Sequence, residues 1–378
     1  MDSIFKTFVY SISFKSQSGQ AFLRLVFLTL LIAVTNLLNA QQQIQKEWSD
    51  TSFPSYIKRM NYFGERPDWS PDGKKFLFVA RSFGDVYEMD IATKIVRPLT
   101  HHYYHGGYLR ALYLSNGDIA LIGPKSFPAE NWKEARFKLS ELWILDKKLQ
   151  SPPVRMGEYV WEGPAISRTQ LKIAWAEHHG SYPDQKRFWQ IWVADIDYSS
   201  GIPSLKNQRV VLDNSSGMVK GAVLEPQNFR PGNEEELTVQ SSGQGIGNNS
   251  TEVLGLNMKT GKLVNYSRSP ASYNEPEGIF PDGQYTLVES SRHRTMESTA
   301  RNIDLYKLKL DSSGVWERIT LFNEGGKFKA TNPVISNDGK FMAFMVARCD
   351  EMAGIGHGIY ILDFEELEKA ANKGKVKK

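Results

Sequence analysis

The sequence predicts an all-β chain that forms one six-bladed β-propeller, with four antiparallel strands in each blade. Three observations lead to this fold. A strand–turn–strand unit recurs six times, at a spacing of roughly fifty residues that is typical of propeller blades. Further strands follow each copy of the unit. The last copy lacks its fourth strand, and a spare strand precedes the first copy.

The clearest copy of the unit occupies residues 66–79 (RPDWSPDGKKFLFV). At its centre, Pro71 fixes its own φ, Asp72 can accept backbone hydrogen bonds, and Gly73 tolerates a positive φ. The residues on both sides are apolar and aromatic, as in β-strands. The segment therefore predicts two strands joined by a tight turn.

Five more copies follow along the chain, and each is the inner hairpin of a predicted blade. They lie at residues 110–118, 163–176, 226–239, 275–283 and 332–340. A third strand follows each of the six hairpins, at residues 86–90, 142–146, 191–195, 253–258, 303–311 and 359–363. A fourth strand follows in five of them, at residues 95–99, 153–156, 209–212, 263–266 and 316–321. Four strands per blade is the number found in propellers.

The incomplete sixth blade predicts how the ring closes. After Asp363 the chain becomes polar and rich in lysine, and no fourth strand is evident. Residues 58–65 (KRMNYFGE) resemble the fourth strand of blade five and its continuation, residues 317–324 (ERITLFNE). The N-terminal segment is therefore expected to complete blade six, which removes an open sheet edge.

Residues 1–40 have the pattern of a signal peptide. Basic residues precede an uncharged stretch at 25–38, and Ala40 offers a small-residue cleavage point. The stretch is shorter than the ~20 residues that span a bilayer, and an uncleaved N-terminal anchor is the alternative. The expected organisation is a propeller domain over residues 41–366 and a basic tail at 367–378. The expected location is periplasmic or secreted, with no membrane attachment after cleavage.

Composition and motifs exclude several classes of function. The formal net charge is +4, and the lysines of the tail account for it, so no basic footprint for nucleic acid is present. The only cysteine, Cys349, cannot form an internal disulfide or a thiolate-rich metal site. The sequence contains no Gly-x-Ser-x-Gly, His-Glu-x-x-His or phosphate-loop motif, so no catalytic residues are assigned.

The turn at residues 69–74 (WSPDGK), set between two strands, resembles the WD40-like (PD40) repeats of the TolB propeller family. The resemblance covers residues 55–365 and implies the propeller architecture. Together with the signal-peptide pattern, it leads us to expect an exported, monomeric binding or scaffold propeller. Its partner would be a protein or a small acidic or sugar-like ligand. The α/β domain that precedes the propeller in TolB has no counterpart, because the first blade follows residues 1–40 closely. A role like that of TolB in a cell-envelope complex does not follow from this resemblance.

Propeller geometry predicts which face binds the ligand. The connections between blades and the loops between second and third strands share one face of a propeller, and in this sequence these segments are long. We call this face the long-loop face. All seven histidines fall on this face, and several glutamates begin or precede innermost strands at the channel mouth. Aromatic residues such as Trp132 and Tyr182 lie in the same loops. The candidate ligand-binding residues are His105, Arg110, Glu162, His178, Glu275, Glu277, Arg292 and His293. A polar loop surface and a water-filled channel explain the same residues without any ligand.

Two functions compete. The first is a non-catalytic binding or scaffold propeller, which needs no cofactor. The alternative is a metal-assisted lyase or hydrolase acting on acidic oligosaccharides, because the repeats are also similar to those of oligogalacturonate lyases. In that case histidines would hold a divalent metal, arginine would neutralise a uronate carboxylate, and a base would remove the adjacent proton. Those lyases resemble a seven-bladed form, whereas six blades are counted here. A third possibility is docking of a protein through blade edges or the channel.

Overall fold

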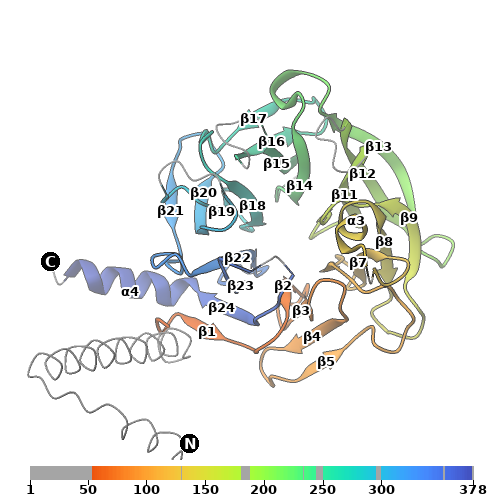
Figure 1. Cartoon of the computed structure of the whole chain (residues 1–378), viewed down its shortest axis with the longest axis horizontal. Coiled ribbons are helices and arrows are strands. Elements are labelled where there is room, and N and C mark those ends of the chain that lie inside the picture. The colour runs from red at the N-terminus through yellow and green to blue at the C-terminus, as the bar shows by residue number, and fades with distance from the viewer. Residues whose placement is uncertain are drawn as a thin grey trace, which may run out of the picture. The chain divides into compact units, whose positions relative to one another are not determined.

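The structure, a computed structural model, describes residues 53–128, 130–179, 188–232, 234–243, 250–294, 299–351 and 354–376. These residues form six four-stranded antiparallel sheets, arranged as blades around a central channel (Figure 1). The predicted all-β, six-bladed propeller is therefore confirmed. Residues 1–40, assigned above to a signal peptide or anchor, and Tyr182 lie outside the described residues.

Each of the first three blades takes four consecutive strands, from the channel outward. Blade one contains β2 (Glu65–Trp69), β3 (Lys75–Val79), β4 (Val86–Asp90) and β5 (Val96–Pro98). Blade two contains β6 (Arg110–Tyr113), β7 (Ile119–Pro124), β8 (Ser140–Leu145) and β9 (Val154–Tyr159). Blade three contains β10 (Ala165–Ile166), β11 (Lys172–His179), β12 (Phe188–Asp197) and β13 (Ser204–Asp213).

The remaining blades follow the same order, except that blade six borrows its outer strand from the start of the chain. Blade four contains β14 (Val223–Phe229), β15 (Glu236–Ser242), β16 (Thr251–Asn257) and β17 (Leu263–Asn265). Blade five contains β18 (Asn274–Ile279), β19 (Tyr285–Ser290), β20 (Asp304–Lys309) and β21 (Trp316–Arg318). Blade six contains β22 (Phe328–Ile335), β23 (Phe341–Arg348), β24 (Ile359–Asp363) and β1 (Ile57–Arg59).

The ring closes where β1 pairs with β24. Ile57 lies opposite Leu362 and Arg59 opposite Tyr360, and the amide of Met60 donates to the carbonyl of Ile359 at 2.8 Å. This confirms that the N-terminal segment completes blade six. The strand is shorter than residues 58–65, because the chain leaves β24 after Met60 and enters the innermost strand β2 at Glu65.

The predicted tight turns have a common hydrogen-bond pattern. In blade one, the Ser70 hydroxyl donates to Asp72 at 2.7 Å and accepts from the Lys75 amide at 3.0 Å, and Gly73 has a φ of +69°. Blade six repeats the pattern with Ser336 and Asp338. The Ser-Pro-Asp-Gly and Ser-Asn-Asp-Gly sequences thus form the turns that join the first and second strands.

The hydrophobic core lies between neighbouring blades. Each large cluster of buried apolar side chains combines residues of two adjacent sheets, such as Trp69 and Phe78 of blade one with Ala343 and Ile361 of blade six. The Trp69 indole also donates to the carbonyl of Val334 at 3.1 Å. Burial of apolar side chains, at roughly 25 cal/mol per Å², therefore joins the blades into one ring.

Helices are few. A short helix, α3 (Trp132–Glu134), continues into a π-helical turn, η1 (Ala135–Leu139), in the long loop between β7 and β8. A 3₁₀ turn, η2 (Gly217–Val219), follows β13, and α4 (Phe364–Val376) continues the chain outward from β24 (Figure 1). Among the described residues, no helix combines the length and the apolar character needed to cross a membrane.

Candidate functional site: the channel mouth and the adjoining cavity

The innermost strands bring charged side chains to the channel. Arg66 lies on β2, Arg110 on β6, Glu225 on β14 and Glu275 on β18, and Glu162 lies three residues before the start of β10. Because each innermost strand starts on the long-loop face, residues at the strand starts gather at one mouth of the channel. The side chains at the starts of the innermost strands therefore determine the chemistry of this channel mouth.

Glu162 forms ion pairs with two arginines, Arg136 and Arg66, on its side of the channel. Arg136 donates to it from Nε and Nη2, at 2.8 and 2.7 Å, and Nη2 of Arg66 lies 3.6 Å away. Burial alone would raise the pKa of Glu162. The guanidinium of Arg136, helped by that of Arg66, outweighs burial and lowers the pKa to about 2. Glu162 is therefore ionised at any physiological pH.

On the opposite side of the channel, carboxyl groups outnumber the cationic side chains that could pair with them. Asn332 donates from Nδ2 to Glu277 at 3.0 Å and from its backbone amide to Glu289 at 2.6 Å. Arg110 Nη2 lies 3.5 Å from Glu277, and the Tyr273 hydroxyl donates to Glu275. Gln240, with its amide oriented to suit its neighbours, donates to Glu275 and Glu225 at 3.2 and 3.0 Å. Four blades thus contribute to one polar network.

Burial, together with mutual repulsion, raises the pKa values of three of these carboxyl groups, Glu225, Glu275 and Glu289. Burial, followed by repulsion from Glu275, raises the pKa of Glu225 well above its ordinary value. The same two causes act on Glu289. Burial, followed by repulsion from Glu277, raises the pKa of Glu275 to about 7. The channel network therefore keeps protons at neutral pH and can exchange one of them near pH 7.

The network contains four of the eight candidate residues, Arg110, Glu162, Glu275 and Glu277. The candidates His105 and His178 are bound elsewhere. His105 Nε2 lies 3.0 Å from Asp85, and its Nδ1 accepts the Gly107 amide at 2.9 Å. His178 Nε2 bonds the carbonyl of Phe137 at 2.7 Å. Both histidines thus fix loops of the long-loop face, each beside a different blade.

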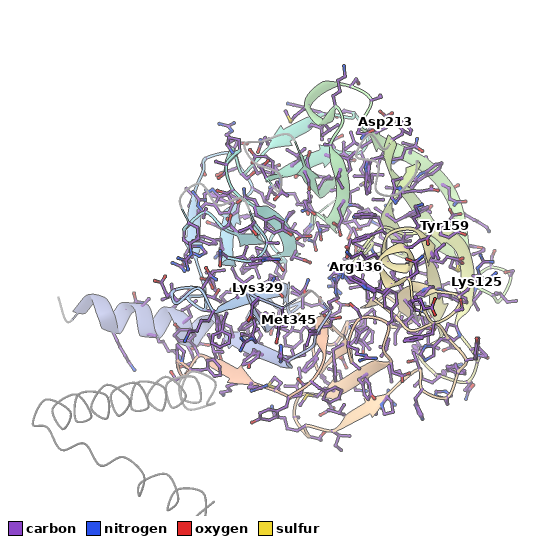
Figure 2. The ribbon with its side chains drawn as sticks, viewed as in Figure 1. Lys125, Arg136, Tyr159, Asp213, Lys329 and Met345 are labelled. Carbon is purple, nitrogen blue, oxygen red and sulfur yellow. The ribbon has the colours of Figure 1, made fainter. Side chains whose placement is uncertain are left out.

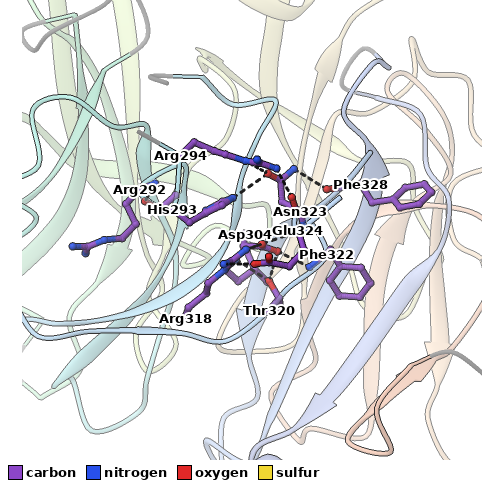
Figure 3. Close-up of polar contacts among 12 residues, drawn as sticks. Arg292, His293, Arg294, Asp304, Arg318, Thr320, Phe322, Asn323, Glu324 and Phe328 are labelled. Atoms are coloured by element: carbon purple, nitrogen blue, oxygen red, sulfur yellow. Dashed lines mark hydrogen bonds and ion pairs between the residues drawn. The ribbon is translucent and has the colours of Figure 1, made fainter. Parts of the chain in front are cut away.

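Arg292 and His293 lie in the β19–β20 loop, and their side chains diverge (Figure 3). His293 Nε2 lies 3.0 Å from Oδ1 of Asn323, which Arg294 also contacts from Nε at 3.1 Å. The Arg292 guanidinium instead stacks over the ring of Trp316, 4.0 Å from its centroid. These two candidates therefore do not share a site with the channel network.

The histidine metal site of the alternative lyase or hydrolase hypothesis has no matching geometry among the described residues, where no group of three or more His, Cys, Asp or Glu side chains is placed to hold a metal ion. The histidines are separated because each blade carries its own loop. The rings of His101 and His102 meet edge to face with their centroids 5.0 Å apart, whereas His105 turns toward Asp85.

A cavity of about 500 Å³ opens on the long-loop face beside this network. It is formed by the loops between second and third strands of blades one, two and six. We call it the seam cavity, because it lies where blade six meets blade one. Its principal lining residues are Arg81, Ser82, Phe83, Phe127, Trp132, Arg136, Gly354 and Gly356.

Close backbone packing builds the floor of the seam cavity. The Ser82 amide donates to the carbonyl of Gly354 at 3.2 Å. A Cβ atom on Gly356 would lie 2.4 Å from the backbone of Gly64, closer than any tolerated contact. Glycine at 356 therefore lets two loops from opposite ends of the chain meet, and the cavity depends on the closure of the ring.

The sequence singled out Trp132 as a loop aromatic, but it did not indicate Arg81, Phe127 or Arg136 as site residues. Glu65 and Arg66 could have been predicted as channel-mouth residues from the sequence. They lie at the start of the innermost strand of blade one, as Glu275 does in blade five. Arg136 carried none, because its approach to Glu162 requires the π-helical turn η1.

No protein-family model and no curated protein matches this sequence. The fold does match solved structures. A gluconolactonase from Xanthomonas campestris aligns with a TM-score of 0.51 at 11% identity, covering 81% of this chain and 88% of that chain. Oligogalacturonate lyase from Vibrio parahaemolyticus aligns with 0.46 at 13% identity, covering 81% and 93%. TolB from Acinetobacter baumannii aligns with 0.41 at 14% identity, covering 80% and 67%.

These identities are low, and the likeness shows the fold alone. The chain is a six-bladed β-propeller of four-stranded blades. As the repeats predicted, this architecture resembles that of TolB, and the matched structures also include an oligogalacturonate lyase and a gluconolactonase. One propeller scaffold supports many functions, so function has to be argued from the site.

Proposed function

We propose that this protein is an exported, non-catalytic binding propeller whose seam cavity recognises an acidic, sugar-like ligand. The observation that carries the proposal is the combination, in one cavity of about 500 Å³, of a cationic side chain with exposed aromatic rings. Phe127 and Trp132 keep 59% and 37% of their surface exposed there. Pockets of this size on a rigid scaffold are typical of small-molecule sites.

Arg81 supports the acidic part of the ligand. Arg136 also lines the cavity, but its guanidinium is already paired with Glu162. Arg81 is exposed, and among the described residues its side chain forms no ion pair. A guanidinium in this state can bind a carboxylate through two parallel hydrogen bonds.

The aromatic residues support the sugar-like part. A pyranose ring has an apolar C–H face, and a flat aromatic ring can cover it without losing a hydrogen bond. Trp132 and Phe127 offer such rings, and Ser82 and the Gly354–Gly356 backbone supply polar groups. The Ser82 hydroxyl donates to Glu65 at 3.1 Å, so it can serve the ligand as an acceptor. The cavity therefore matches a ligand that is polar at its edge, flat on one face and negatively charged.

The arrangement favours binding over catalysis. A general acid or base must lie within hydrogen-bond reach of the reacting atom. The carboxyl groups with raised pKa values, Glu225, Glu275 and Glu289, belong to the channel network, and the described residues that line the seam cavity include no carboxylate. Turnover of a bound glycan would support the competing lyase or hydrolase hypothesis.

The test is a titration of the purified chain with acidic oligosaccharides by calorimetry, followed by chromatography of the glycan. Trp132→Ala should weaken binding by roughly tenfold or more, the loss of about 1.4 kcal/mol that a buried aromatic anchor contributes. Tyr104→Ala is the matched control, since Tyr104 is 93% exposed on the same face outside the cavity. Recovery of a cleaved glycan would overturn the non-catalytic assignment, and the absence of binding would overturn the ligand.

Export rests on the pattern of residues 1–40. Expression of the full chain in a bacterial host, followed by sequencing of the mature N-terminus, tests it. A periplasmic protein that begins near Gln41 is the expected result, and a cytoplasmic product that retains residue 1 would contradict it.

A further inference from the structure

A second cavity, of about 300 Å³, lies next to the seam cavity on the long-loop face. We call it the aromatic cavity, and the side chains that matter in it are Phe137, Lys138, Tyr159, Trp161, Glu177 and His178. It is formed by the end of η1, the end of β9 and the end of β11. Except for His178, none of these residues was a candidate in the sequence.

The two cavities share one wall. Trp132 and Arg136, from α3 and η1, line the seam cavity, whereas Phe137 and Lys138, the next residues of η1, line the aromatic cavity. Arg136 lies closer to the centre of the ring than Tyr159 (Figure 2). A single turn of π-helix thus separates an inner cavity from an outer one, and such turns often occur at functional sites.

A stack of side chains crosses this wall. The Arg136 guanidinium lies 5.7 Å from the ring centroid of Phe137, and the Phe137 ring stacks on Trp161 at 4.7 Å with 23° between their planes. Trp161 meets Trp189 edge to face, also at 4.7 Å. The hydrogen bond from His178 to the carbonyl of Phe137 fixes the same turn to β11. The aromatic cavity is therefore preformed, which lowers the entropic cost of binding.

The lining of the aromatic cavity suits a sugar residue. Tyr159 is 45% exposed, so an aromatic ring is open to a ligand. Lys138 offers a cation, Glu177 a carboxylate and His178 an imidazole, so both donors and acceptors surround the ring. The volume is at the lower end of the range for ligand sites, which fits one ring-sized group rather than a chain.

We propose that the aromatic cavity is a second subsite, which binds another residue of the same acidic oligosaccharide that occupies the seam cavity. This inference rests on the proposed function. The sugar ring lies against Tyr159 and Trp161, Lys138 pairs with its carboxylate, and Glu177 accepts from its hydroxyl groups. The ligand is then an oligomer that crosses η1, and its affinity depends on its length.

The test is the dependence of affinity on chain length, measured by calorimetry with galacturonic acid oligomers from two to six residues. For the wild-type chain, affinity should rise with length. Tyr159→Ala should remove most of that rise, lowering the affinity for the longest oligomer by roughly tenfold while the dimer binds as before. Lys138→Gln is a second variant, chosen because it keeps the packing of the side-chain stem. Tyr104→Ala should behave as wild type.

The outcomes distinguish failure of the second subsite from failure of ligand binding in the seam cavity. If both variants bind long and short oligomers as the wild type does, the aromatic cavity is not a subsite and the seam cavity stands. If wild-type affinity does not change with length, the second subsite is also refuted. If the wild-type chain binds no acidic oligomer, both proposals fall. Thermal unfolding midpoints of Tyr159→Ala and Lys138→Gln should equal that of the Tyr104→Ala control. A loss of affinity in these variants is then not caused by a loss of folding.

Discussion

Arg168 of blade three forms a bidentate ion pair with Asp68 of blade one, with Nη2–Oδ1 at 2.6 Å and Nη1–Oδ2 at 3.2 Å. Asp68 also accepts the backbone amide of Tyr113, in blade two, at 2.7 Å. One fully buried carboxylate thus joins three consecutive blades. The ring is held at its centre by polar contacts as well as by apolar packing between blades.

Removing this carboxylate should destabilise the propeller strongly. Asp68→Ala leaves a buried amide and the partly exposed Arg168 guanidinium without their partner, so the cost should be about 3 kcal/mol, the lower end of the range for breaking a buried pair. Asp350→Ala is the matched control, because Asp350 pairs with Arg348 at the exposed surface, where such a pair contributes about 0–1 kcal/mol. Urea unfolding measures both. Equal unfolding free energies for the two variants would contradict the role of Asp68.

The free energy of unfolding should decrease from pH 5 to pH 8. Glu225, Glu275 and Glu289 have raised pKa values in the folded chain, about 7 for Glu275, against an ordinary value of 4.5. Between these pH values the folded chain binds more protons than the unfolded chain, so stability falls as pH rises, by about 1.4 kcal/mol per pH unit for each such proton. Glu162, with its pKa lowered to about 2, stabilises the fold above pH 4.5 and loses this effect only as pH falls toward 2.

The variant Glu275→Gln isolates one of these carboxyl groups. An amide cannot ionise, so the decrease in unfolding free energy between pH 5 and pH 8 should become shallower. Glu317→Gln is the control, since Glu317 is exposed on the outer strand β21. Chemical denaturation at several pH values measures the slope. The same slope in Glu275→Gln as in the wild type would show that Glu275 is already ionised at pH 5.

Ring closure should depend on β1. A chain that starts at residue 61 lacks Ile57–Arg59 and leaves β24 with an unpaired edge. Open edges pair with other chains, so this truncation should lower the unfolding midpoint and form oligomers. A chain that starts at residue 53 keeps β1 and is the control. Gel filtration and thermal unfolding separate the two, and a stable monomer from the shorter chain would refute closure by β1.

His293 should contribute to folding and not to ligand binding. His293→Ala removes a hydrogen bond to Asn323, which costs about 1 kcal/mol, and it leaves the seam cavity intact. Thermal unfolding and titration with an acidic oligosaccharide measure the two effects. A large loss of affinity with an unchanged unfolding midpoint would place the site at the histidines, as the sequence alone suggested.

The fold was predictable because its signals are local. The Pro71–Asp72–Gly73 turn and its repeats mark each inner hairpin, and the spare strand before the first blade accounts for the strand that the sixth blade lacks. The start of each innermost strand could be located in the same way. Glu162, Glu225, Glu275 and Glu277 could therefore be expected at the channel mouth from sequence.

The rest of the site depends on distances between blades. The pairing of Arg136 with Glu162 joins a loop of blade two to blade three, and no periodic pattern encodes it. The seam cavity requires Gly356 to approach Gly64 from the other end of the chain. The histidines share one face of the propeller, as expected. Because they belong to loops of different blades, they are spread around the ring and do not form one site.

Recognition of an acidic sugar by the seam cavity is tested by comparing one acidic oligosaccharide with its neutral form. Calorimetric titration with digalacturonate, which occupies only the seam cavity, and with its methyl ester keeps size, shape and ring faces similar and removes only the negative charge. Because Arg81 and the aromatic rings share the seam cavity, the acid should bind roughly tenfold more tightly than the ester, and Arg81→Gln should abolish this difference. Equal affinities for acid and ester in the wild-type chain would contradict recognition of an acidic sugar by the seam cavity.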